Sequence, residues 1–195
     1  MRAKLDQHFL VDEGIADRIV AAAGPRAGEK LVEIGPGRGI LTERLVDSGA
    51  LVTAVEIDEA LHASLVERFR GREDVTLLRA DFLELDLSTL PSPAKVVSNL
   101  PYSMATPILQ RLLPWTGWTE ATLMFQKEVA ERVEAGPGGR DYGVLSLSVQ
   151  VYADAARLFD VGRFSFRPPP KVQSSVVRLA RRDVPRLPPE VAPEA

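Results

Sequence analysis

The sequence has no cysteine, only two histidines, and no apolar run that approaches the roughly 18 residues of a membrane-spanning helix. Without cysteine the chain has no disulfide, no thiolate nucleophile and no cysteine-ligated zinc site. Its first residues also lack the apolar stretch of a signal peptide. We therefore expect a cytoplasmic protein that holds no metal and does not associate with membranes.

The formal net charge is −3, which is unlike a protein that coats nucleic acid with its whole surface. The stretch from Arg163 to Arg182 differs, because it contains six basic residues and no acid. The six are Arg163, Arg167, Lys171, Arg178, Arg181 and Arg182. Such a cluster is either a strip that faces nucleic-acid phosphates or a solvated strand face, and the cluster alone does not decide between them.

Short apolar runs alternate with helical segments, which predicts an α/β fold with a mostly parallel sheet. Strands are expected at 31–34, 51–57, 75–80, 95–99, 121–126, 156–161 and 171–180. Helices are expected at 40–49, 59–71, 106–114 and 127–136. The segment 142–154 is ambiguous, although its β-branched content favours a strand. Residues 1–182 are expected to form one domain, followed by a proline-rich tail or linker stump at 183–195.

A glycine-rich loop, Glu33–Gly39, lies between the first predicted strand and the following helix. Its glycines allow a sharp turn and a close approach to a ligand. Glu56 ends the next strand, where an acid can accept hydrogen bonds from the ribose hydroxyls of an adenosine cofactor. The spacing G-x-G-x-G differs from the G-x-G-x-x-G of nicotinamide enzymes. Asp81, after the third strand, can accept from the cofactor's adenine amine or simply cap a helix.

The tetrapeptide Asn99–Tyr102 follows the fourth predicted strand, so it should line the ligand crevice at the carboxyl ends of the strands. An exocyclic adenine amine is a poor nucleophile, because its lone pair is delocalised into the ring. The Asn99 side-chain oxygen and the Leu100 carbonyl can accept hydrogen bonds from the two N–H groups of this amine. Pro101 fixes the backbone that holds them. Tyr102 offers a face on which the base can stack. The alternative is a strand-ending turn.

Neither histidine has the setting of a general base. His62 falls on the exposed side of a predicted helix, and His8 lies near the N-terminus, where a lone histidine is more often structural. The proposed chemistry needs no strong base, because the amine becomes acidic once methylated and can release its proton to water. Catalysis would come mainly from positioning and hydrogen bonding.

Taken together, the motifs resemble the ribosomal RNA adenine N6,N6-dimethyltransferase family. They are Gln7–Leu10, Glu33–Gly39, Glu56, Asp81, Asn99–Tyr102, Phe125–Ala130, Tyr142–Gly143 and Phe166–Val172. The resemblance implies a Rossmann-like class I S-adenosylmethionine-dependent methyltransferase, with a seven-stranded sheet and helices on both faces. One branch of the family dimethylates two adjacent adenines near the 3′ end of small-subunit rRNA. The other modifies large-subunit rRNA and confers macrolide resistance. Gln126–Val129 and Pro168–Val172 resemble the small-subunit branch more closely.

The resemblance also implies roles for individual residues. Cofactor contacts are expected at His8, Leu10, Gly35, Gly37, Glu56, Ile57, Asp81, Phe82 and Asn99. Catalytic roles are expected for Asn99, Leu100, Pro101, Tyr102 and Phe166, with the rings of Phe166 and Tyr102 sandwiching the target adenine. Arg163, Arg167 and Lys171 are expected to contact RNA. Residues 142–152 are expected to be helical, against their local β propensity.

Two departures from the family are visible. Ser103-Met104-Ala105 stands where Asn-Ile-Ser is usual, and the sequence ends at Ala195, where a small helical C-terminal domain would begin. The leading hypothesis is the catalytic domain of an rRNA adenine dimethyltransferase, monomeric and acting on the small ribosomal subunit. The alternatives are a non-catalytic ribosome-assembly or RNA-binding module that keeps the cofactor pocket, a large-subunit methyltransferase, and a methyltransferase with another substrate.

Overall fold

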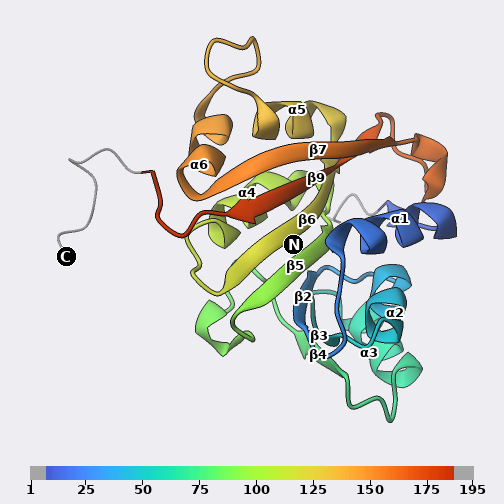
Figure 1. Cartoon of the computed structure of the whole chain (residues 1–195). Coiled ribbons are helices and arrows are strands. Elements are labelled where there is room, and N and C mark those ends of the chain that lie inside the picture. The colour runs from blue at the N-terminus through green and yellow to red at the C-terminus, as the bar shows by residue number, and fades with distance from the viewer. Residues whose placement is uncertain (1–7, 187–195) are drawn as a thin grey trace.

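The structure, a computed structural model, describes residues 8–186 and is built on one twisted seven-stranded sheet (Figure 1). In spatial order the strands are β4 (Val75–Arg79), β3 (Leu51–Glu56), β2 (Lys30–Ile34), β5 (Ala94–Asn99), β6 (Trp118–Gln126), β9 (Ser174–Arg181) and β7 (Ala153–Val161). The first five are parallel, and β9 is antiparallel to both of its neighbours. This arrangement confirms the predicted mostly parallel α/β sheet.

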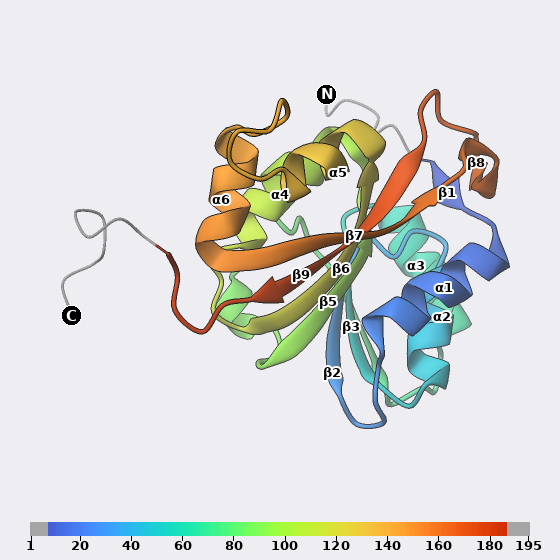
Figure 2. The same ribbon diagram turned by 45° about the horizontal axis from the view of Figure 1, so that its top comes forward.

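Helices cover both faces of the sheet (Figures 1 and 2). One face carries α1 (Glu13–Ala23), α2 (Ile40–Asp47) and α3 (Glu59–Arg68), and the other carries α4 (Ala105–Leu112), α5 (Lys127–Glu134) and α6 (Val144–Tyr152). Three short 3-10 turns complete the elements: η1 (Leu87–Thr89), η2 (Tyr102–Met104) and η3 (Arg163–Ser165). Two apolar clusters result, and the adjacent β5 residues Val96 and Val97 belong to different ones. Such double burial is typical of the central strands of parallel sheets.

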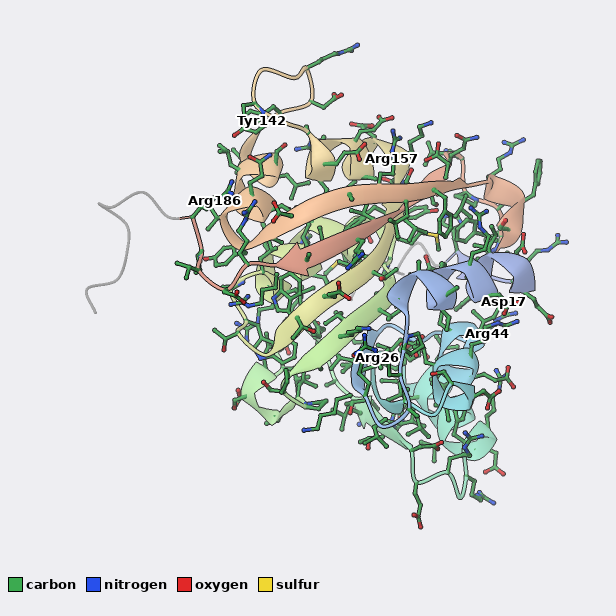
Figure 3. All side chains as sticks on the ribbon, in the orientation of Figure 1. Asp17, Arg26, Arg44, Tyr142, Arg157 and Arg186 are labelled. Atoms are coloured by element: carbon green, nitrogen blue, oxygen red, sulfur yellow. The ribbon has the colours of Figure 1, made fainter. Side chains whose placement is uncertain are left out.

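Helix α1 was not predicted from the sequence, although its ends carry recognisable signals. The Asp12 side chain accepts a hydrogen bond from the Ile15 N–H (3.1 Å), and Gly24 ends the helix in the left-handed conformation with φ of 53°. Arg44 of α2 donates to Asp17 of α1 over 2.5 Å (Figure 3). These contacts and its buried Ile19 fix α1 against the sheet.

The ambiguous segment forms helix α6, as the family resemblance implies. Its Ser146 hydroxyl donates to the Arg132 carbonyl (2.6 Å), and the Gln150 side chain donates to the Ala135 carbonyl (2.9 Å). Leu145 and Val149 are buried on the same side of the helix, while Val144 is 75% exposed. Packing against α5 therefore outweighs the β propensity of the local sequence.

A second, two-stranded sheet connects the N-terminal motif to the proline-rich segment. Strands β1 (Phe9–Leu10) and β8 (Phe166–Arg167) pair antiparallel, with Leu10 opposite Phe166. The Ser165 carbonyl also accepts from Val11 N–H (2.9 Å). Residues that are far apart in sequence thus meet beside the carboxyl ends of the parallel strands.

The chain contacts α6 on both sides of the predicted end of the domain at 182. The Arg182 and Arg186 N–H groups donate to the carbonyls of Tyr152 and Val151, both at 2.8 Å, and Figure 3 shows Arg186 beside this helix. The rest of the predicted tail, 187–195, and Gln7 of the N-terminal motif lie outside the described residues. Between residues 8 and 186, no helix is both long and apolar enough to cross a bilayer.

Candidate active site

A cavity of about 1080 Å³, counting the open space at its mouth, lies at the carboxyl ends of β2, β3 and β5. Its wall includes every residue for which a cofactor contact is expected: His8, Leu10, Gly35, Gly37, Glu56, Ile57, Asp81, Phe82 and Asn99. Leu100, Pro101 and Tyr102 line the same cavity. The fold therefore brings the glycine loop and the Asn99–Tyr102 tetrapeptide together in one place.

The glycine loop turns through backbone conformations that favour glycine. Gly35, Gly37 and Gly39 have φ of +66°, +57° and +79°. A Cβ on Gly37 would lie 3.3 Å from the Phe9 ring, and one on Gly39 would lie 2.8 Å from Leu65 Cδ2. The loop therefore needs glycine both for its turn and for the close packing of β1 and α3 around it.

Glu56 is held rigidly at the end of β3. It is 4% exposed, and its two carboxylate oxygens accept hydrogen bonds from different backbone N–H groups. Oε2 accepts from Gly37 (3.0 Å) and Oε1 accepts from Asp58 (2.9 Å). The side chain is thus an anchored acceptor on the cavity wall, in the position where the sequence predicts a contact to ribose hydroxyls.

Asp81 begins a turn and lines the cavity, and the alternative that it caps a helix is wrong, because the structure has no helix between β4 and η1. Its Oδ1 accepts from the Leu83 N–H (3.0 Å), and its carbonyl accepts from the Leu85 N–H (2.9 Å). The neighbouring Phe82 is 4% exposed and packs in the core cluster of α4. The turn therefore fixes a side chain that also lines the cavity.

Glu33 is a cavity residue to which the sequence analysis gave no role. It is 1% exposed, and its Oε2 accepts from the Thr42 hydroxyl (2.6 Å). Burial raises the pKa of the Glu33 carboxyl to about 8, despite the opposing effect of that hydrogen bond, and the Glu56 charge raises it further. The sequence could have indicated this residue, because an acid inside a predicted buried strand, next to a glycine loop, is unusual.

Asn99, the only asparagine in the sequence, ends β5 with its side chain at the cavity. Its Nδ2 lies 3.5 Å from the His8 carbonyl, to which it donates. The Leu100 N–H donates to the Met124 carbonyl (3.3 Å). These contacts hold the start of the tetrapeptide between β1 and β6.

Tyr102 is fixed by contacts of its hydroxyl and of its ring. Its hydroxyl lies 2.6 Å from the hydroxyl of Ser174, a fully buried residue of β9. Burial raises the pKa of the Tyr102 phenol. Its ring centroid is 5.5 Å from that of His8, with the planes tilted by 35°. His8 in turn donates from Nδ1 to the Pro168 carbonyl (2.7 Å).

His62 does not lie where the sequence pattern placed it. The expectation of an exposed position was wrong, because the side chain is half-buried and its Nε2 is 3.4 Å from the Leu77 carbonyl of β4. The packing of α3 on the edge of the sheet turns this side of the helix inward. His62 is not among the residues of the cavity wall.

Phe166 lies in the core and not in the cavity wall. It is 1% exposed, and it belongs to the same apolar cluster as Ile19 and Val161. The pairing of β8 with β1 sets Phe166 opposite Leu10. In this conformation the ring beside Tyr102 is that of His8. The expected sandwich of adenine between Phe166 and Tyr102 stays a prediction, and it requires the Phe166 side chain to reorient.

The basic cluster divides into two groups with different surroundings. Arg178, Arg181 and Arg182 have partners within the protein, in contrast to the other half of the basic stretch. Arg178 pairs with Glu120, and Arg182 pairs with Asp154. Arg181 donates to the carbonyls at positions 113 and 115, over 3.1 and 3.0 Å. These three side chains therefore stabilise the packing of β9.

The other group consists of Arg163, Arg167 and Lys171, and all three are exposed. Arg167 lies in β8, opposite Phe9 of β1, and Phe9 lines the cavity. The cationic group therefore begins at the cavity rim, where a phosphate-bearing substrate would approach.

Sequence comparison shows the family to which the chain belongs. A family model described as ribosomal RNA adenine dimethylase matches residues 1–191. The chain is 46% identical to ribosomal RNA small subunit methyltransferase A of Pseudomonas putida, over 94% of this chain and 70% of that protein. It is 44% identical to the protein of the same name from Methylococcus capsulatus, over 94% of this chain and 73% of that one.

Solved structures agree with these sequence matches. A dimethyladenosine transferase from Plasmodium falciparum superposes with a TM-score of 0.82 at 30% identity, covering 90% of this chain. This chain spans 64% of that protein's length. The 23S rRNA methyltransferase ErmE superposes with a TM-score of 0.82 at 33% identity. The match covers 93% of this chain and 73% of the ErmE chain.

Proposed function

Because this chain belongs to the ribosomal RNA adenine dimethylase family, we propose that it uses S-adenosyl-L-methionine to methylate the N6 amine of adenine in small-subunit rRNA. We further propose that it dimethylates two adjacent adenines near the 3′ end of that RNA. One observation carries the proposal: a single cavity is lined by the anchored Glu56 and by the Asn99–Tyr102 tetrapeptide. Glu56 suits the ribose of a nucleoside cofactor, and the tetrapeptide suits an exocyclic amine.

The residues of the cavity fit S-adenosyl-L-methionine. Glu56 presents a fixed carboxylate to ribose hydroxyls, and the glycine loop turns beside it at Gly35 and Gly37, both with positive φ. Ile57 and Phe82 offer apolar surface to an adenine ring. When bound, the cofactor supplies an electrophilic methyl group on a sulfonium.

The tetrapeptide prepares the substrate amine. Because the Asn99 amide nitrogen donates to the His8 carbonyl, the amide oxygen of Asn99 is the acceptor available to one amine proton. The Leu100 carbonyl accepts a hydrogen bond from the second N–H of the amine, and Tyr102 holds the base by stacking. These bonds favour a tetrahedral nitrogen whose lone pair points at the methyl group. The proton leaves to water after transfer, so positioning supplies most of the rate enhancement.

The choice of the small subunit is supported by the names and identities of the relatives. Two small-subunit methyltransferases are 46% and 44% identical to the chain, whereas the large-subunit enzyme ErmE is 33% identical. We propose that the partner is the small ribosomal subunit, in the cytoplasm, and that the chain acts as a monomer.

Substitution of Asn99 tests the mechanism. Asn99→Ala should lower methyl transfer by at least about a hundredfold, because a positioned acceptor is lost, with little change in the free energy of unfolding. Asn99→Asp keeps acceptor oxygens and should retain more activity than Asn99→Ala. Full activity of Asn99→Ala would refute the mechanism. Cofactor binding without transfer by the unmodified chain would favour a non-catalytic assembly module.

A further inference from the structure

Phe164 is an exposed aromatic residue that the core does not explain. It lies in η3 and is 75% exposed, whereas the other six phenylalanines are buried or half-buried. The guanidinium of Arg163 lies 4.8 Å from the centroid of its ring. Phe164 thus presents aromatic surface to solvent with a cation beside it, an arrangement that suits a flat, electron-rich partner.

The backbone around Phe164 is tied directly to the wall of the cavity. The next residue, Ser165, accepts from the Val11 N–H through its carbonyl (2.9 Å) and donates to Asp12 through its hydroxyl (2.9 Å). Phe166 then pairs with Leu10, which lines the cavity. Phe164 therefore lies two residues from a strand that pairs with Leu10 of the cavity wall.

The basic stretch that contains Phe164 in the sequence favours a nucleic acid over a protein as the partner. Arg163, Arg167 and Lys171 are all exposed, and no acid occurs between Arg163 and Arg182. Exposed cations around an aromatic face are typical of surfaces that bind single-stranded nucleic acid, where bases stack and the phosphates meet the cations.

We propose that Phe164 and Arg163 form a stacking platform for a nucleotide that flanks the target adenine in unpaired RNA. Arg167 and Lys171 contact the phosphates of the same strand. The platform selects for an unpaired, unstacked segment, because a base within a duplex cannot present its face to Phe164. This inference rests on the proposed function, since it takes the cavity to be the site that receives the adenine.

The test uses the 195-residue chain and an unpaired RNA of about ten nucleotides, with one adenine and a 2-aminopurine next to it. Binding is followed by fluorescence anisotropy, and stacking by quenching of the 2-aminopurine. Phe164→Leu keeps an apolar side chain and removes the aromatic face, so it should weaken binding about fivefold or more and reduce the quenching. Phe164→Tyr should restore both. Val66→Ala, at an exposed site on α3, is the matched control.

Salt dependence separates stacking from phosphate contact. Phe164→Leu should leave the slope of log affinity against log salt unchanged, whereas Lys171→Ala should reduce it by about one. If Phe164→Leu binds and quenches as the unmodified chain does, the platform does not exist.

Methyl transfer is measured in parallel. If the unmodified chain methylates RNA while Phe164→Leu binds normally, only this inference fails. If the unmodified chain methylates no adenine, the proposed function fails.

Discussion

The carboxylate of Glu56 accepts a 3.0 Å hydrogen bond from the backbone N–H of Gly37, so the acid at the end of β3 is fastened to the loop after β2. The other oxygen of Glu56 accepts from Asp58. The residue therefore holds the glycine loop and the start of α3 around the proposed ribose position, and its orientation is set before any ligand arrives.

Glu56→Gln should weaken cofactor binding strongly, although glutamate and glutamine have almost the same shape. A glutamine NH2 group would face one of the two backbone N–H donors, which sets donor against donor, and the negative charge is lost. We expect the Kd for S-adenosyl-L-methionine, measured by calorimetry, to rise at least about tenfold, equivalent to roughly 1.4 kcal/mol. The control is Glu59→Gln, at an exposed acid that pairs with Arg79. An unchanged Kd for Glu56→Gln would contradict the assigned role.

Glu33 predicts a specific dependence of stability on pH. Its pKa is raised from 4.5 to about 8 in the folded chain. Below pH about 4.5 the group is protonated in both the folded and the unfolded chain. Between these two values the folded chain keeps a proton that the unfolded chain releases, so the free energy of unfolding falls as the pH rises.

Glu33→Gln removes this titration and can keep the acceptor for Thr42. Relative to the unmodified chain, the variant should therefore gain stability as the pH rises from about 5 to 8, at roughly 1.4 kcal/mol per pH unit at most. Urea denaturation of both proteins without cofactor measures the difference, in which the titrating groups that do not interact with Glu33 cancel. Parallel stability curves across this range would show that the pKa of Glu33 is not raised.

Much of the fold could be predicted from the sequence, because its elements are determined locally. Short apolar runs bounded by glycine and acidic residues mark β2 and β3, and Asp58 caps α3 by accepting from two backbone N–H groups. The alternation of these elements specifies the parallel sheet. Helix α6 could not be decided locally, since its conformation depends on Ser146 and Gln150 reaching the end of α5.

The site was less predictable, because motifs show which residues are near each other in sequence and not which way they face. Glu56 and Asn99 line the cavity, since strand ends of a parallel sheet converge there. Phe166 belongs to an equally specific motif, yet its pairing with Leu10 sets it in the core. In the same way, Arg178 pairs with Glu120 across two strands that are distant in sequence.

The contact between Tyr102 and Ser174 predicts an asymmetric double-mutant cycle. Tyr102→Phe should lower the free energy of unfolding by about 1–3 kcal/mol, because it leaves the buried Ser174 hydroxyl without its partner. Adding Ser174→Ala should recover most of that loss, since removal of both polar groups leaves none unsatisfied. Chemical denaturation of the two single variants and the double variant completes the cycle. Strict additivity would show that the two hydroxyls do not interact.

The most direct test of the central claim is transfer of labelled methyl groups from S-adenosyl-L-methionine to unmethylated small ribosomal subunits, with naked rRNA in parallel. The product RNA is digested to nucleosides and the label is identified. We predict N6,N6-dimethyladenosine from the small subunit, and its loss with Asn99→Ala. If the chain binds the cofactor but places no label on adenine in either substrate, it is not the adenine methyltransferase that the cavity indicates.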